Sequence, residues 1–216
     1  SSSSEKLDRS IGRMYLVLIP LYQGKLEDAL KVSDDGIAAD RMEQFEESMN
    51  AYKHFIKAAL NAEKKKWDLA LSEAQTGIRI LKKLTPNEPV NERGFYAYLL
   101  AKSGKITEAE GLAKALKKDI EEKDTTKMGS YWWALAEIEL AKGDTSKALS
   151  HFERVYKDSP TPSFDLRSYL AEIYLKTGRL DEAVAQLEKA LSRYDEDRVW
   201  SLSLIHISEP TRQAEI

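Results

Sequence analysis

The chain has 216 residues, of which 42% are hydrophobic and 32% are charged, and its net charge at pH 7 is −3. This charge balance gives no reason to expect nucleic acid or an anionic membrane as a partner. No apolar stretch approaches the roughly twenty residues of a membrane-spanning helix, so no membrane span is predicted. The chain contains no cysteine, which excludes disulfides and cysteine-based metal sites, and its few glycines and prolines favour a helical fold.

In chain order, the sequence predicts helices that follow one another in pairs. The predicted pairs are 5–22 with 26–39, 43–64 with 67–84, 89–103 with 106–122, 127–142 with 145–157, and 163–177 with 180–194. Proline-containing turns at 85–89 and 159–163 separate neighbouring pairs. Pro20 lies late in the first helix, which we expect it to kink or to end early.

Each pair carries a small residue in its first helix and an alanine twelve residues later in its second helix. These small-residue pairs are Val17/Ala29, Ala58/Ala70, Ala97/Ala109, Ala136/Ala148 and Ala171/Ala183. Two antiparallel helices joined by a tight turn approach closely only where the facing side chains are small. The recurring spacing therefore predicts a repeated helical hairpin.

A glycine stands five residues before the second-helix alanine in four of the five units: Gly24, Gly104, Gly143 and Gly178. Glycine readily adopts the left-handed conformation that ends a helix and begins a short turn. The second unit departs from this pattern and has Lys65 at that position. The alanines of successive second helices are 41, 39, 39 and 35 residues apart, so the repeat period shortens towards the C-terminus.

The last two units give the clearest sequence motif. One reads Trp132-x2-Leu135-Ala136 and continues with Gly143 and Ala148-x3-Phe152, and the other repeats this spacing around 170–187. These residues resemble the tetratricopeptide repeat, and a bacterial protein is expected. The resemblance implies an all-α, right-handed α-solenoid of about five antiparallel helical hairpins. HEAT-type repeats fit the period but not the glycine-to-alanine spacing.

We expect one continuous repeat array over residues 1–201. Its units lie near 10–42, 43–88, 89–126, 127–162 and 163–197, and 198–201 form the start of a sixth. Residues 202–216 resemble a translated sequencing adapter and are interpreted as a non-native tail, with a genuine polar C-terminus as the alternative. The chain is expected to be an internal fragment of a longer protein, which leaves its compartment open, with the cytoplasm slightly favoured.

Nothing in the sequence indicates a catalytic, cofactor-binding or metal-binding site. Outside the suspected tail the only histidines are His54 and His151, which lie in different units and show no metal-ligand spacing. No phosphate-binding glycine loop or dinucleotide-binding motif is present. The chain is therefore predicted not to be an enzyme, and no cofactor is implied.

The family resemblance implies that the first helices of successive hairpins line a concave groove for a peptide or a partner helix. Transferring the family's groove positions gives a predicted binding set: Tyr22, Tyr52, Phe55, Tyr98, Trp133, Glu137, Glu172 and Lys176. This groove would be apolar at its N-terminal end and more acidic further on, which favours an apolar partner with some basic residues. The aromatic residues could instead pack against neighbouring hairpins, and the sequence leaves both alternatives open.

The same resemblance argues against one known binding mode. Chaperone-binding members clamp a terminal carboxylate with basic and amide side chains, but the matching positions here include Phe55, Ala59, Trp133 and Glu137. No carboxylate-clamp chaperone binding is therefore expected. The leading hypothesis is a protein–protein interaction scaffold. The alternative is the regulatory or sensory C-terminal region of a larger signalling protein, such as a Ser/Thr kinase, nucleotide cyclase or winged-helix regulator.

Overall fold

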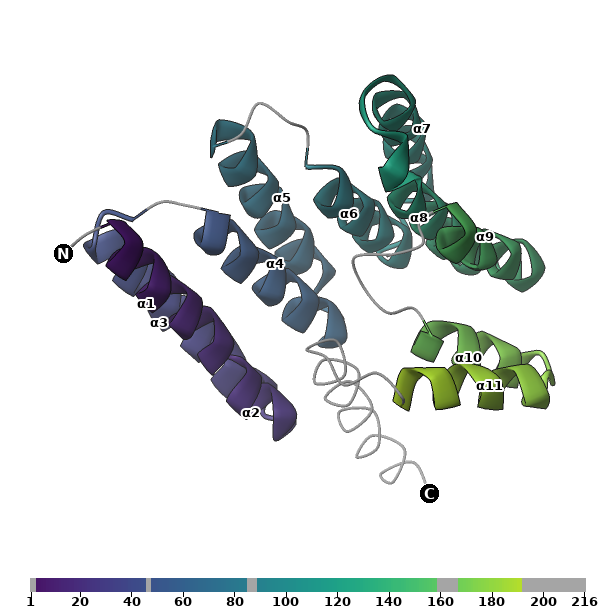
Figure 1. Ribbon diagram of the computed structural model, residues 1–216, viewed down its shortest axis with the longest axis horizontal. Helices are drawn as coiled ribbons and strands as arrows, with labels where there is room; N and C mark the ends of the chain where they lie inside the picture. Colours follow the sequence, from purple (N-terminus) through teal and green to yellow (C-terminus); the bar gives the residue numbers. More distant parts are fainter. Residues whose placement is uncertain (1–2, 46–47, 85–88, 159–166, 192–216) are drawn as a thin grey trace. The chain divides into compact units, whose positions relative to one another are not determined.

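The computed structural model describes residues 3–45, 48–84, 89–158 and 167–191 (Figure 1). Within these ranges the regular elements are all helical. The helices form two compact units, of which unit 1 holds α1 to α5 and unit 2 holds α6 to α11. The continuity of the array over residues 1–201 stays a prediction, and the expected start of a sixth repeat at 198–201 and the tail at 202–216 lie outside the described residues.

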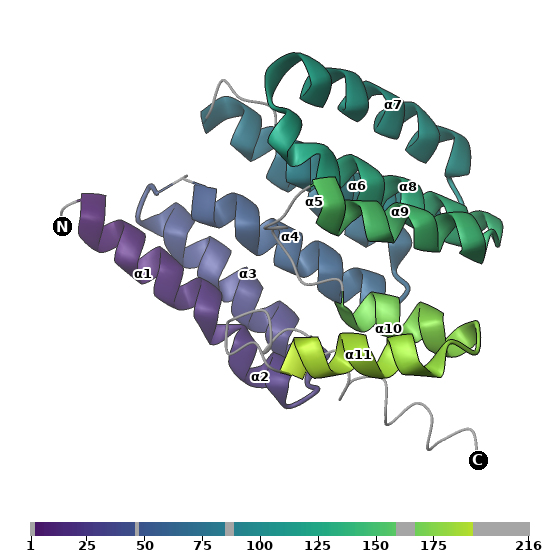
Figure 2. The ribbon, with the colours of Figure 1, turned by 45° about the vertical axis from the view of Figure 1, so that its right-hand side comes forward.

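Unit 1 is built from α1 (Ser3–Leu16), α2 (Leu18–Tyr22), α3 (Leu26–Met42), α4 (Ser48–Glu63) and α5 (Trp67–Leu84). The interrupted helix α1–α2 runs alongside α3, and α4 pairs with α5 (Figures 1 and 2). Helix α4 also packs on both α1 and α3, so the two hairpins of this unit pack against each other.

Pro20 explains why the predicted first helix is interrupted. Its nitrogen has no hydrogen to donate to the carbonyl of Leu16, and its ring would clash with that carbonyl in a regular helix. The helix breaks at Val17. The N–H of Val17 donates to the carbonyl of Met14, three residues earlier, at 3.2 Å, whereas an α-helical N–H donates to the carbonyl four residues earlier. The predicted effect of Pro20 is therefore confirmed.

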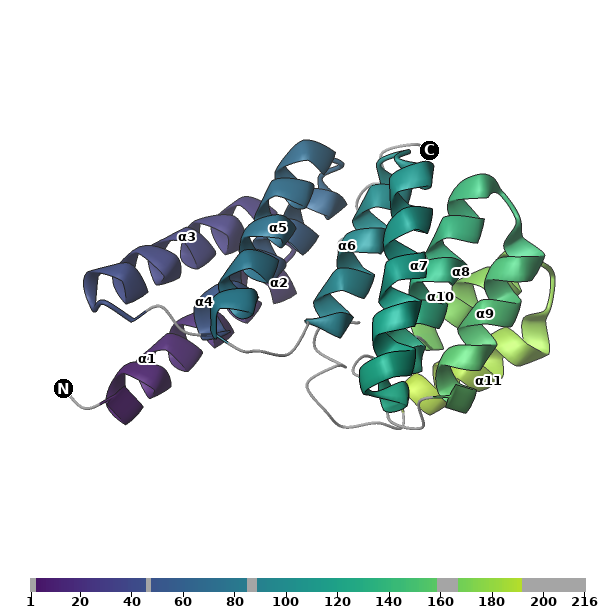
Figure 3. The same cartoon turned by 90° about the horizontal axis from the view of Figure 1, so that it is seen from above.

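Unit 2 consists of three hairpins. They are α6 (Val90–Lys102) with α7 (Ile106–Lys123), α8 (Met128–Lys142) with α9 (Thr145–Asp158), and α10 (Arg167–Lys176) with α11 (Leu180–Leu191) (Figure 3). A single 3-10 turn, η1 (Thr125–Lys127), leads from α7 into α8. Helix α8 packs on both α6 and α7, as α4 does on its preceding hairpin.

The small-residue positions are buried in all five hairpins. Each of the ten side chains is at most 1% exposed: Val17, Ala29, Ala58, Ala70, Ala97, Ala109, Ala136, Ala148, Ala171 and Ala183. Each pair has one member in each helix of its hairpin, and small buried side chains at these positions allow the two helices to approach closely. The prediction of repeated hairpins is confirmed, and most helix ends lie within one residue of the predicted ranges. The predicted helical stretches at 163–166 and 192–194 lie outside the described residues.

The second-helix alanines have a purely structural place in the fold. Ala29, Ala70, Ala109 and Ala183 each begin the second turn of α3, α5, α7 and α11, and each is completely buried. A side chain that is closed off in this way cannot contact a partner. These four positions therefore hold the hairpins together and do not belong to a binding surface.

The turn positions share one backbone geometry. The four turn glycines have φ values between +71° and +85°, and Lys65 adopts the same left-handed conformation at +55°. The geometry of the turn therefore persists in the second hairpin although its residue type does not. A non-glycine residue in this conformation costs roughly 1–2 kcal/mol.

One predicted helix start is wrong. The second hairpin begins at Ser48 and not near residue 43, because α3 continues to Met42 and then ends in a turn. Gln44 takes a left-handed conformation with φ +54°, and the N–H of Phe45 donates to the carbonyl of Asp40 at 2.9 Å. This backbone pattern ends a helix without glycine, which is why residue type did not reveal it.

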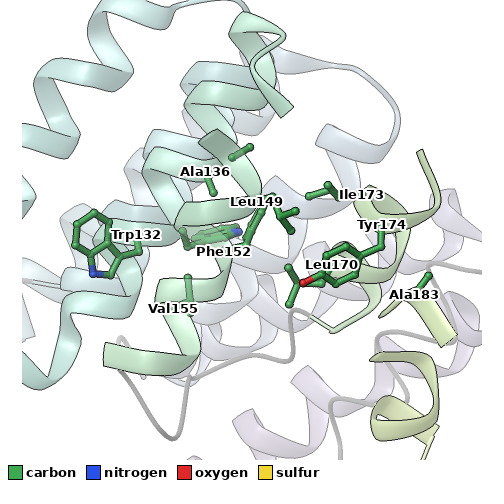
Figure 4. Close-up of a cluster of buried hydrophobic side chains, with 11 residues drawn as sticks. Trp132, Ala136, Leu149, Phe152, Val155, Leu170, Ile173, Tyr174 and Ala183 are labelled. Atoms are coloured by element: carbon green, nitrogen blue, oxygen red, sulfur yellow. The ribbon is translucent and has the colours of Figure 1, made fainter. Parts of the chain in front are cut away.

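The main apolar core of unit 2 joins its second and third hairpins. Phe152 and Val155 of α9 lie at its centre, with Leu170 and Tyr174 of α10 on one side and Trp132 of α8 on the other (Figure 4). Phe152 is completely buried. Among the described helices, none combines the length and the hydropathy that a membrane-spanning segment requires.

Candidate functional site

The first helices of unit 2 carry the predicted binding residues at matching positions. Tyr98, Glu137 and Glu172 each follow the small first-helix residue of their hairpin by one position, so they occupy equivalent places on α6, α8 and α10. Lys102 and Lys176 each lie one helical turn further along the same helices. We call this set, with Phe95 and Trp133, the first-helix face of unit 2.

Close packing of α6 against α8 brings members of this face together. Gly94 makes that approach possible, because a Cβ atom at this position would lie 3.1 Å from the carbonyl oxygen of Ser130. A hydrogen bond of 2.5 Å from the Ser130 hydroxyl to the side chain of Asn91 joins the same two helices. Any larger residue at position 94 would push the helices apart.

Three aromatic rings form a stack on this face. The Tyr98 ring lies 5.5 Å from Trp133 and 5.8 Å from Phe95, with interplanar angles of 23° and 26°. Trp133 is 7% exposed, whereas Tyr98 and Phe95 are half-buried. Trp133 thus forms the buried part of the stack, and the two more accessible rings pack against it.

Charged residues lie on the same face as the aromatic stack. The ammonium group of Lys102 lies 5.7 Å from the centre of the Tyr98 ring and 3.2 Å from Oε2 of Glu137. Glu172 forms an ion pair of 2.6 Å with Lys176 one turn along α10. The Glu172 and Lys176 side chains are well exposed, so this end of the face is polar and open to solvent.

Glu137 differs from its neighbours because its side chain is completely buried. Burial raises the pKa of its carboxyl group, Lys102 and the indole N–H of Trp133 lower it, and the negative charge of Glu172 raises it further. Among the described residues, neither carboxylate oxygen of Glu137 accepts a hydrogen bond of regular geometry. A buried carboxylate without such hydrogen bonds is costly, and it stands beside the aromatic stack.

The predicted residues of unit 1 are less closely grouped. Tyr22 on α2 and Tyr52 on α4 are exposed, and Phe55 is half-buried. Phe55 packs against Gly77 of its own hairpin, where an added Cβ would meet the ring at 2.7 Å, and its ring centre is 6.3 Å from that of Tyr52. Phe55 thus contributes to the α4–α5 hairpin, and the role of these residues in binding stays a prediction.

Sequence analysis did not reveal the buried polar network in unit 1. The side chains of Lys53 and Asp40 are fully buried and form an ion pair, and the Lys53 ammonium also donates to the Ser10 hydroxyl at 2.7 Å. Ser10 donates to Asp40 at 2.7 Å, and Arg13 donates to the second Asp40 oxygen at 2.8 Å. The network therefore ties α1, α3 and α4 together.

Gly36 was the one available signal for this network. It lies in the middle of α3, where glycine is unfavourable, and an added Cβ would meet Lys53 Cε at 3.3 Å and Arg13 Cβ at 3.4 Å. At the rim, hydrogen bonds from Arg9 and Arg13 lower the pKa of Glu43 to about 2. Since its central groups are closed off from solvent, the network serves to join helices.

Both histidines in the described ranges make structural contacts. Nδ1 of His54 lies 2.6 Å from a carboxylate oxygen of Glu73, which also pairs with Lys57 at 2.6 Å. The ring of His151 stacks on Trp132 with 5.6 Å between ring centres. Within the described ranges, no group of three potential ligands is placed to hold a metal ion.

Comparisons with known proteins agree with this repeat structure. Two tetratricopeptide repeat models match the sequence, one at residues 97–162 and the other at 139–203. No curated protein matches the chain in sequence.

Solved structures extend the likeness to most of the chain. The nearly identical TPR-like repeats of a Podosopora anserina protein, described as a kinesin light chain, align with a TM-score of 0.53 at 17% identity. A second structure of these repeats aligns with a TM-score of 0.54 at 16% identity, and both alignments cover 90% of this chain and 94% of the other. The structural likeness supports the solenoid fold of repeated hairpins, and the sequence matches indicate tetratricopeptide repeats over residues 97–203.

Proposed function

We propose that the first-helix face of unit 2 binds an extended segment or a helix of a partner protein. Tetratricopeptide repeats typically form non-catalytic scaffolds for other proteins, which supports a protein as the partner. The observation that carries the proposal is the aromatic stack of Phe95, Tyr98 and Trp133, with the ion pair of Lys102 and Glu137 beside it. Rigid aromatic side chains are frequent energetic centres of protein interfaces.

The charges on this face favour a particular kind of partner. Glu137 and Glu172 come from neighbouring first helices, and the negative charge of Glu172 is close enough to raise the pKa of the Glu137 carboxyl group. A segment with apolar residues for the aromatic stack and basic residues for the carboxylates would complement both features. Acidic chain termini would be repelled by the same carboxylates, so we propose that carboxylate-clamp ligands do not bind here.

A selection from a library of twelve-residue peptides on the immobilised 216-residue chain tests the proposal. We expect enriched peptides to be apolar with basic residues, and Tyr98→Ala to weaken their binding at least tenfold while the protein remains folded by circular dichroism. Glu108→Gln provides a matched control, because it changes an exposed residue of the second helix α7. A chaperone-type peptide ending in acidic residues serves as the negative ligand.

The proposal fails if no peptide is enriched, or if Tyr98→Ala and Glu108→Gln bind the enriched peptides as tightly as the parent chain. Equal binding of the acidic chaperone-type peptide would contradict the expected selectivity.

A further inference from the structure

Glu137 is unusual because its side chain is fully buried and yet makes very few polar contacts among the described residues. Its one ion-pair partner in the described part of the chain is Lys102, whose ammonium lies 3.2 Å from Oε2. Neither oxygen accepts a hydrogen bond of regular geometry there, although a carboxylate can accept several. A buried ion pair is stabilising only when further hydrogen bonds satisfy its remaining sites. Among the described residues, the two carboxylate oxygens of Glu137 therefore retain capacity to accept well-aligned hydrogen bonds.

Lys102 is not fixed firmly over this carboxylate. Its side chain is 35% exposed, while that of Glu137 is 0% exposed, so the lysine reaches the carboxylate from the solvent side. A lysine ammonium is a compact charge on a flexible stem. It can leave Glu137 at little cost if another cation takes its place.

The surroundings of Glu137 suit a second cation. The Tyr98 ring already lies 5.7 Å from the Lys102 ammonium, within the range of a cation–π interaction. Glu172 on α10 adds a second carboxylate, and its side chain is 57% exposed. A guanidinium group could approach the aromatic face and donate two parallel hydrogen bonds to a carboxylate, which an ammonium cannot do.

We propose that Glu137 is the anchor for an arginine side chain of the bound partner, and that Lys102 occupies this position in the unbound protein. The inference rests on the proposed function of the first-helix face. In the complex, the arginine displaces Lys102, pairs with Glu137, and lies beside Tyr98 with Glu172 nearby. Lys102 is thus an internal competitor for the partner.

The peptides enriched in the selection provide the probes. One enriched peptide is synthesised with its arginine, and again with citrulline, which has the same shape without the charge. Both forms are titrated by calorimetry into the 216-residue parent chain, Glu137→Gln, Lys102→Met and the control Glu108→Gln. Melting curves show that each variant is folded.

We expect both Glu137→Gln and the citrulline replacement to weaken binding at least tenfold. Combined, they should cost little more than either alone, because they remove the same contact. Lys102→Met should bind the arginine peptide several-fold more tightly, because the competing ammonium is gone. A purely structural role for the Lys102–Glu137 pair would not produce that gain.

The outcomes separate this inference from the proposed function. The arginine site is wrong, while the binding face stands, in either of two cases. In the first, the enriched peptides depend on Tyr98 but show no preference for arginine. In the second, the losses of affinity from citrulline and from Glu137→Gln add up when the two changes are combined. If no peptide is enriched, both fail. Should Glu137→Gln not fold, the citrulline replacement and Lys102→Met carry the test. If citrulline binds the parent chain as tightly as arginine, or if Lys102→Met gives no gain for the arginine peptide, the inference is overturned.

Discussion

Replacing Asp40 by asparagine should reveal how strongly the buried network holds unit 1 together. Asparagine has nearly the same shape as aspartate, so the change removes the charge without opening a cavity. Lys53, whose side chain is fully buried, would lose its anionic partner and keep the Ser10 hydroxyl at 2.7 Å. Breaking a buried ion pair typically costs about 3–5 kcal/mol. We expect about 3 kcal/mol, since the asparagine oxygen and Ser10 can still accept hydrogen bonds.

A second variant separates the charge from the rest of the site. In Asp40→Asn with Lys53→Met, the ammonium is replaced by an apolar side chain of similar length, so no uncompensated buried charge remains. Replacing a buried ion pair by well-packed apolar groups is often neutral. We therefore expect the double variant to be within about 1 kcal/mol of the parent chain, well above the single variant.

Urea unfolding followed by far-ultraviolet circular dichroism gives the free energy of unfolding of both variants. The values are compared with the dependence on urea concentration, the m-value, held equal. The pH dependence gives an independent check. Burial lowers the pKa of Lys53 from its ordinary value of 10.5, so the unfolded chain binds more protons between the two pKa values and stability rises with pH there. Without the Asp40 charge, this rise should begin at lower pH. A loss below about 1 kcal/mol in Asp40→Asn, or a double variant no better than the single, would refute the reasoning.

Five further substitutions test the hairpins and the binding face. Ala148→Leu should destabilise the chain by about 1–3 kcal/mol through overpacking, and an unchanged melting temperature would contradict the tight α8–α9 contact. Gly143→Ala should cost about 1 kcal/mol in urea unfolding from its φ of +85° alone, because no atom lies within 4 Å of the added Cβ. Glu137→Gln should be more stable than the parent chain at pH 7. Burial raises the pKa of Glu137 above its ordinary 4.5, so the stability of the parent chain falls as pH rises between the unfolded-state and folded-state pKa values. Melting temperatures measured across this pH range should show the fall in the parent chain and not in the variant. Trp133→Ala should cost at least about 3 kcal/mol, whereas Tyr52→Ala, at an exposed position, should cost under about 1 kcal/mol, and comparable losses in thermal unfolding would show that burial does not distinguish them.

The close agreement of helices with the sequence prediction has a local origin. Ala136 and Ala148 are separated by twelve residues and one turn, and Gly143 lies within that span. Side-chain size and backbone preference at these positions act over short distances, so they can be recognised from spacing. The late start of α4 was missed because Gln44 ends the preceding helix through its backbone conformation, which its residue type does not signal.

Residue spacing was sufficient to locate a row of helical hairpins, their turns, and the helices on which the candidate binding residues lie. Which of these side chains are accessible became visible only from the packing of the helices. Trp133 and Glu137 are buried while Tyr22 and Glu172 are exposed, although all four were predicted for the same groove. The difference arises because burial on a first helix depends on the neighbouring hairpin, which is encoded by residues some forty positions away. For the same reason Lys53, a charged residue in an ordinary helical stretch, lies at the centre of unit 1: its partners Ser10 and Asp40 reach it only when three separate helices pack together.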